Sequence, residues 1–137
     1  MPVIPFTIGI PMDHIGSNIP RALIVTWGPM ANGDTGKPYV SPNRADKSVQ
    51  LRGTFGAAGN ARIEGTNDQA YDSVGNTASP APTFATLNDP QGNVLDITTA
   101  KIEEILENPN AIRPNITAGD GTTALTVVLL VSSVMKQ

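Results

Sequence analysis

The sequence predicts an all-β protein, an antiparallel β-sandwich or jelly roll of about eight short strands with one short amphipathic helix. The spacing of apolar residues is one reason: Val49, Leu51 and Phe55 alternate with polar residues, as in a strand with one buried face and one solvated face. Composition is the other reason. The chain holds 13 glycines and 12 prolines among 137 residues, which favours short strands joined by many turns over a helical bundle. At this length we expect a single domain, residues 1–137.

The first predicted element is an extended N-terminal arm, residues 1–20. Its opening residues are apolar but are interrupted by Pro2, Pro5 and Pro11, which remove backbone donors and favour an extended chain. Two interpretations remain open. The arm either lies as an edge strand against its own domain or extends to embrace a neighbouring subunit.

A strand and a long loop follow the arm. Residues 21–27 form a nearly continuous apolar run rich in β-branched and aromatic side chains, which predicts a strand covered on both faces. We expect Trp27 to lie in the core and Gly28-Pro29 to end the strand. Residues 31–44 contain three turn signals in a row and no periodicity, so we predict a long loop.

The middle of the chain predicts consecutive pieces of an antiparallel sheet. Residues 48–55 and 61–65 each alternate between apolar and polar positions, and the turn-rich segment between them predicts a β-hairpin. A second long polar loop, residues 69–82, is expected to have a flexible or outward-facing tip. Residues 84–87 and 94–97 predict two more short strands on either side of an NDPQGN turn.

The last third of the chain predicts the helix and the clearest hairpin. Ile102, Ile105 and Leu106 fall at i, i+3 and i+4, which places them on one face of a short amphipathic helix. Residues 112–118 and 122–131 predict two strands joined by a tight Gly-Asp-Gly turn, and the second strand has Leu125, Val127, Leu129 and Val131 on one face.

Composition also limits the classes of partner. The net charge is −3 and the cations are scattered, so the basic stripe that nucleic-acid binding requires is missing. The chain has no cysteine, which excludes disulfides and thiolate metal sites. We expect no signal peptide, and the most apolar run, residues 125–131, is far shorter than the roughly 20 residues of a membrane-spanning helix. We therefore expect neither nucleic acid nor a membrane as a partner.

No pattern in the sequence predicts catalysis or cofactor binding. His14 is the only histidine and lies near Asp13 and Ser17, but a serine-type triad also needs fixed elements and an oxyanion hole that nothing signals. Turn chemistry accounts for Asp34 and Asp120, because neither stretch has the ordered oxygen ligands of a calcium site. The prediction is a protein that is not an enzyme and that needs no cofactor or metal.

Four motifs occur in order between residues 48 and 131: GTFG, IEGTND, LNDPQGN and RPNITAGDGTT. In this order they resemble small structural proteins encoded in the virion gene clusters of tailed bacteriophages. The size, acidity and lack of cysteine are also similar to those of capsid cement or decoration proteins, some of which are small jelly rolls that dimerise across two-fold positions. Residues 69–82 depart from the shorter version of this pattern.

The resemblance implies a structural virion protein that binds the outer surface of a phage icosahedral capsid and cements neighbouring major capsid subunits. It implies two partners, the major capsid protein and further copies of the chain itself, with a dimer favoured over a trimer. It also implies synthesis in the bacterial host cytoplasm and a final place on the outside of the virion. A stiff scaffold with an arm that crosses subunit boundaries suits this role, so we place the shell contacts on residues 1–6 of the arm and on the loop 31–44. The candidate interface residues are Pro2, Val3, Ile4, Phe6, Lys37, Tyr39 and Arg44.

Two alternatives come from other classes of protein. A carbohydrate-binding sandwich would group exposed aromatic side chains on one face, and only Tyr39 and Tyr71 are suitable for that. A tail-tube or head-completion component would instead assemble into tubes or rings.

Overall fold

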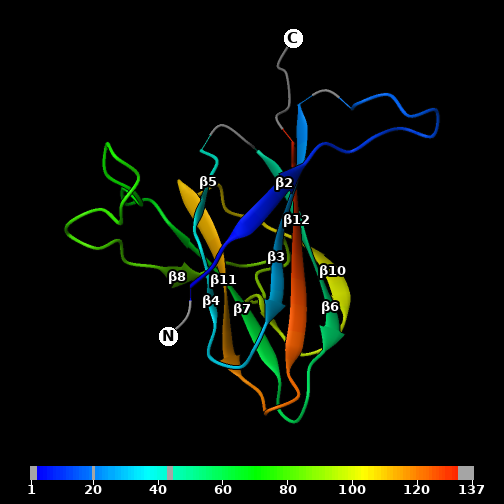
Figure 1. Ribbon diagram of the computed structural model, residues 1–137, viewed down its shortest axis with the longest axis vertical. Helices are drawn as coiled ribbons and strands as arrows, with labels where there is room; N and C mark the ends of the chain where they lie inside the picture. The colour runs from blue at the N-terminus through cyan, green and yellow to red at the C-terminus, as the bar shows by residue number, and fades with distance from the viewer. Residues whose placement is uncertain (1–2, 20, 43–44, 133–137) are drawn as a thin grey trace.

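The computed structural model describes residues 3–19, 21–42 and 45–132, and this part of the chain contains strands and turns but no helix (Figure 1). The all-β prediction is confirmed. The strands form two sheets that pack face to face around one hydrophobic core, in a β-sandwich-like arrangement.

The five-stranded sheet contains the three longest strands of the described chain. Its order is β10 (Lys101–Glu104), β6 (Asp46–Thr54), β12 (Ala124–Ser132), β3 (Ala22–Met30) and β2 (Phe6–Gly9). Neighbouring strands in this sheet are all antiparallel.

The seven-stranded sheet is assembled from shorter pieces around two longer strands. Its order is β1 (Val3–Ile4), β4 (Thr35–Gly36), β11 (Ala111–Ala118), β7 (Asn60–Thr66) and β8 (Ala85–Thr86), with β5 (Tyr39–Val40) beside β11 and β9 (Asp96–Ile97) beside β7. β1 pairs with β4 in parallel, and every other pair among the described strands of this sheet is antiparallel.

The core follows the predicted alternation. β12 contributes Leu125, Val127, Leu129 and Val131, and each of these side chains is 0% exposed. Trp27 of β3 lies beside them at 1% exposed, as predicted. Its indole N–H donates to the carbonyl of Lys37 at 2.9 Å, so the buried ring has no unsatisfied donor.

Both predicted hairpins are wrong. β6 and β7 belong to different sheets, and so do β11 and β12, so each turn crosses the sandwich from one sheet to the other. β6 pairs instead with β12, and β7 pairs with β11. Alternation determines which face of a strand is buried, but it does not select the partner strand.

These two crossing turns, the arches 55–59 and 119–123, bond to each other at one end of the sandwich (Figure 1). Asp120 accepts the backbone N–H of Ala57 at 2.7 Å, and the hydroxyl of Thr123 donates to a carbonyl of the other arch at 2.8 Å. Hydrogen bonds from Thr122 and from the Ala57 backbone lower the pKa of Asp120 to about 2. The ionised carboxylate therefore ties the two arches together.

The predicted helix is also wrong, because its residues form β10 and the segment after it. β10 pairs with β6 at the edge of the sheet. Ile105 is buried at 3% exposed, whereas Ile102 and Leu106 are 63% and 54% exposed, so the three side chains do not share a buried face. A helix of two turns is marginal in water, whereas the edge of β6 offers a ladder of backbone hydrogen bonds.

Two further boundaries differ from the prediction. β3 continues through Gly28 and Pro29, because the register with β12 shifts between Leu125 and Val127 and a bulge tolerates the missing proline donor. The predicted loop 31–44 contains the short strands β4 and β5.

The polar excursion over residues 69–82 projects from the sandwich, as predicted (Figure 1). It contains a small hairpin closed by a bridge between Tyr71 and Thr77. No helix capable of spanning a membrane occurs in the described ranges.

Candidate interaction surface on the N-terminal arm

The N-terminal arm joins both sheets of its own domain. β1 lies beside β4 in the seven-stranded sheet, and β2 lies beside β3 in the five-stranded sheet. The backbone N–H of Lys37 also donates to the carbonyl of Ile4 at 2.8 Å. Residues 3–9 are therefore edge strands of their own domain, which is the first of the two interpretations that the sequence left open.

Residues 10–19, which we call the arm hairpin, extend beyond the sandwich (Figure 1). Two backbone hydrogen bonds within the arm hairpin form its turn. The N–H of Asp13 donates to the carbonyl of Ser17 at 2.8 Å, and the N–H of Gly16 donates to the carbonyl of Asp13 at 3.1 Å. The Asp13 carboxylate accepts the N–H groups of Ile15 and Ser17, both at 3.0 Å. Gly16 has φ of 85°, a region that favours glycine.

The same turn occurs at two other places, beginning at Asp72 and Asp89. In each case the carboxylate accepts two backbone N–H groups, and a glycine three residues later has positive φ. The shared sequence pattern is D-x-x-G-[SN]. In two of the three turns the residue at the third position is apolar and exposed: Ile15 and Val74 are each 76% exposed.

The arm concentrates the apolar surface of the molecule. Six of the 12 large hydrophobic side chains that are exposed in the described residues lie between residues 3 and 19. They are Val3, Ile8, Ile10, Met12, Ile15 and Ile19. A grouping of this kind is typical of an interaction surface, whereas single exposed apolar residues need no explanation.

A groove of about 380 Å³ lies beside this arm, between β2 of one sheet and β5 of the other. We call it the open-edge groove, and it is lined by Phe6, Ile8, Lys37, Pro38, Tyr39, Val40, Tyr71 and Gly75. Three of the predicted interface residues, Phe6, Lys37 and Tyr39, therefore meet at one place.

Tyr71 closes one side of the open-edge groove. Its hydroxyl donates to the carbonyl of Pro38 at 2.6 Å, and the Lys37 ammonium lies 5.7 Å from the centroid of its ring. Partial burial raises the pKa of the Tyr71 hydroxyl, which keeps it protonated as a donor.

Two of the predicted interface residues contribute to the core. Tyr39 is only 7% exposed, and the Phe6 ring lies edge-on to Tyr39 and Trp27 with centroids 5.5 and 5.9 Å apart. Tyr39 lies within the predicted loop 31–44, but it belongs to β5, which pairs with β11, and its ring packs in the core. A role for Tyr39 at an interface stays a prediction.

The remaining predicted interface residues divide into three cases. Val3 is 61% exposed on β1, whereas Ile4 packs partly against the core. Pro2 and Arg44 lie outside the described residues.

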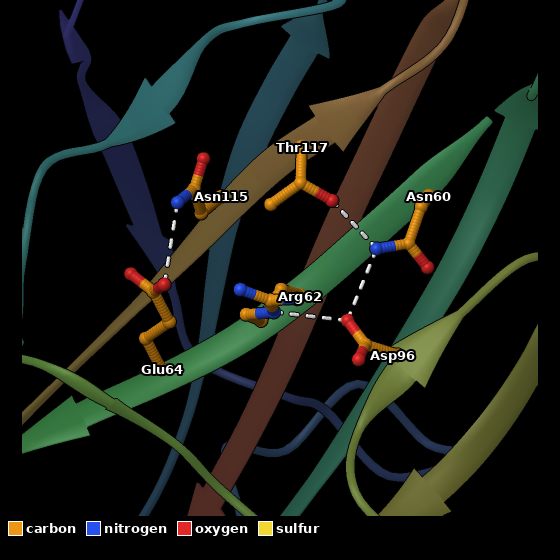
Figure 2. A network of polar contacts seen from close by, with 6 residues as sticks. All are labelled: Asn60, Arg62, Glu64, Asp96, Asn115 and Thr117. Carbon is orange, nitrogen blue, oxygen red and sulfur yellow. Dashed lines mark hydrogen bonds and ion pairs between the residues drawn. The ribbon is translucent and has the colours of Figure 1, made fainter.

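A polar network covers part of the seven-stranded sheet (Figure 2). Asp96 accepts hydrogen bonds from Arg62 and Asn60, both at 3.0 Å, and Asn60 also donates to the Thr117 hydroxyl at 2.6 Å. Burial raises the pKa of Asp96, but the hydrogen bonds from Asn60 and Arg62 outweigh it and hold the pKa below the usual value. The carboxylate is therefore charged and paired at neutral pH.

Glu64 is the second carboxylate of this network. It is 7% exposed and accepts hydrogen bonds from Arg113 at 2.9 Å and Asn115 at 3.2 Å. The Arg113 guanidinium in turn lies 3.7 Å from the centroid of the Phe84 ring. Because these charges are paired within the chain, support of the sheet is the simplest explanation of the network.

Among the groups considered for chemistry, the carboxylates of Asp34 and Asp120 accept backbone N–H groups. In the part of the chain that the structure describes, no three metal-ligating side chains come together. The carboxylate of Asp13 bonds to the backbone of Ile15 and Ser17 and thus serves the turn next to His14.

The arm hairpin is the feature that sequence reasoning missed, since the predicted contacts on the arm ended at Phe6. A signal was available: Ile10, Met12 and Ile15 are apolar residues on and beside a D-x-x-G-S turn. A turn pattern of this type predicts a hairpin, and a hairpin of about ten residues cannot bury apolar side chains by itself.

No family model, curated protein or solved structure matches the chain.

Proposed function

We propose that this chain is a structural virion protein that binds the outer surface of a phage icosahedral capsid and cements neighbouring major capsid subunits. The observation that carries the proposal is the arm hairpin. It presents Ile10, Met12 and Ile15 at 54%, 61% and 76% exposed, well away from the core. The side chain of Ile15 at the tip is suited to inserting between the subunits of a shell.

The base of the arm hairpin supports the same role. The arm enters through β1 in one sheet and β2 in the other, and the chain leaves through β3. A load on the hairpin therefore passes to β2 and β3, which are neighbours in the five-stranded sheet, and β1 ties the start of the arm to the other sheet. Paired arches and the polar network further stiffen the sandwich.

The strand order supports the finer proposal of a jelly roll. One sheet contains β3, β12, β6 and β10 in order, and the other contains β4, β11, β7 and β8. Each long pair joins a strand from the first half of the chain to a strand from its last third, and the eight strands alternate between the two sheets along the chain except that β7 and β8 lie in the same one. Jelly rolls of eight strands occur in viral capsid proteins and in lectins, so the fold is compatible with the role and does not establish it.

The test is binding to expanded heads of the phage that encodes the chain, measured by co-sedimentation. We compare Ile15→Asp with Val74→Asp, because the two side chains are equally exposed and occupy the same position of the same turn in different hairpins. We expect Ile15→Asp to weaken binding by about tenfold or more and Val74→Asp to leave it unchanged. Equal binding by the wild type and Ile15→Asp would contradict the proposal.

Point substitution is preferable to deletion of the arm. Removal of residues 1–6 would take the Phe6 ring out of the aromatic cluster with Trp27 and Tyr39 and would disturb the fold. Ile15 and Val74 contribute little to packing, so both variants should unfold at the same urea concentration as the wild type.

A carbohydrate-binding module is the second candidate, because Tyr71 lines the open-edge groove. It is the weaker candidate, since Tyr39 is buried and the Tyr71 hydroxyl is already bonded to Pro38. Binding on a glycan array that is lost in Tyr71→Ala would favour it over the capsid role.

A further inference from the structure

The two edges of the five-stranded sheet are protected very differently. β10 forms one edge with the sequence KIEE, in which three of four residues are charged. β2 forms the other edge with the sequence FTIG, which has no charge. Natural proteins commonly place charges on edge strands to prevent pairing with another chain, so the absence of charge from β2 calls for an explanation.

The outer side of β2 is available to another strand. In the described part of the chain, β2 pairs with β3 alone. Its other side borders the open-edge groove, where Ile8 is 52% exposed beside Val40 at 42%. A strand added there would form backbone hydrogen bonds with β2 and cover these two apolar side chains.

We propose that two copies of this chain dimerise by antiparallel pairing of their β2 strands, which joins the two five-stranded sheets into one continuous sheet. The pairing is isologous, so the same surface supplies both sides of the interface. The proposal concerns the purified chain and does not depend on the capsid role.

Charge complementarity supports a second copy as the occupant. In an antiparallel pair, the residues after β2 of one copy run past the residues before β2 of the other. The arm hairpin of one protomer thus passes Ile4 of its partner, whose carbonyl is bonded to the backbone of Lys37. Asp13 on the arm hairpin of one protomer and Lys37 at the open-edge groove of the other have opposite charges. Because the dimer is symmetric, this pair occurs twice in the interface.

Apolar complementarity points to the same occupant. Ile10 and Met12 follow β2 directly and are 54% and 61% exposed. In the antiparallel arrangement they lie against the partner's Val3 and Ile4, of which Val3 is 61% exposed. The tip of the hairpin, with Ile15, extends past this contact and stays accessible.

The two edges also provide a matched test. We compare Ile8→Glu on β2 with Ile102→Glu on β10, because both residues are exposed isoleucines on opposite edge strands of one sheet. Sedimentation equilibrium of the full chain should give twice the chain mass for the wild type and for Ile102→Glu. For Ile8→Glu we expect the dimer dissociation constant to rise by about tenfold or more, because two carboxylates then meet across the axis.

Three results would overturn the proposal: a monomeric or trimeric wild type, a dimer that persists in Ile8→Glu, or a dimer that dissociates in Ile102→Glu. Thr7→Lys serves as a second variant on β2 in case Ile8→Glu unfolds, and it should also dissociate the dimer. Hydrogen exchange supplies an independent readout, since protection of the amides in Phe6–Gly9 should rise with protein concentration. Protection that appears only when phage heads are added would assign the edge to a capsid strand and contradict self-pairing.

Discussion

The arm hairpin and the hairpin at residues 88–94 have the same turn but opposite surroundings. Both begin with an aspartate that accepts two backbone N–H groups, and both have a glycine with φ near 85° to 89° three residues later. The flanks of the second hairpin, Leu87 and Leu95, are 5% and 2% exposed, whereas Met12 in the arm hairpin is 61% exposed. The turn therefore determines local shape, and the flanks determine whether a hairpin supports the scaffold or is presented to a partner.

The largest expected difference between the hairpins comes from their flanking side chains. Leu95→Ala should lower the free energy of unfolding by about 2–5 kcal/mol, because it leaves a cavity in the core. Met12→Ala should change it by less than about 0.5 kcal/mol, because the side chain has no core contact to lose. Urea unfolding measures both, and equal effects would contradict the distinction between a packed and a presented hairpin.

A smaller difference is expected from the turn glycines. Gly92→Ala should destabilise the protein by about 1–2 kcal/mol, because an alanine must adopt positive φ in a turn whose flanks are fixed. Gly16→Ala should also strain its turn, but the arm hairpin can rearrange without disturbing the core. We therefore expect the free energy of unfolding to stay the same. Both glycines have open space around the position of a Cβ, so steric clash does not confuse the comparison.

The smallest expected effect is electrostatic. Glu107 accepts hydrogen bonds from the backbone and side chain of Asn88, at 2.8 and 2.6 Å, and thereby holds the second hairpin to the sandwich. Burial raises the pKa of Glu107, but the bonds from Asn88 outweigh it and lower the pKa below its ordinary value. This contribution to stability is therefore present above about pH 4.3 and is lost as the pH falls through the lower pKa of the folded state.

An NMR titration of the Asn88 amide measures this effect. Its shift should change with a midpoint below about pH 4.3, and Glu107→Gln should abolish the change. The Ile15 amide bonds to a different carboxylate and serves as the control, since it should not respond to Glu107→Gln. A midpoint at or above the ordinary glutamate value would contradict the assignment.

Local patterns predicted the five long strands, β3, β6, β7, β11 and β12, but not their partners. The buried face of β12 follows from the alternation of its residues, and the burial of Trp27 follows from the apolar run around it. Both patterns depend only on residues that are neighbours in the sequence. A β-hairpin and an arch between two sheets both have alternating strands on either side of a turn. The sequence therefore could not show whether residues 55–59 return the chain to the same sheet or lead it to the other sheet. Residues 101–104 likewise form a strand and not a helix because they pair with β6, and the local sequence does not contain this pairing.

The candidate site was predicted in part for a related reason. Proline interruptions predicted an extended arm; residues 3–9 pair with the edges of the two sheets, and residues 10–19 project beyond the sandwich. Burial of Tyr39 depends on the pairing of β5 with β11, which no local pattern contains. The exposure of Ile15 likewise depends on the absence of a covering element near residues 10–19 in the described chain.

The most direct test of the capsid role is a cryo-electron microscopy map of purified particles that contain this chain. We expect the sandwich to lie on the outside of the shell, with the arm hairpin in contact with two neighbouring capsid subunits. Density for the chain in the tail or inside the head, or an arm hairpin that faces solvent, would contradict the proposed function.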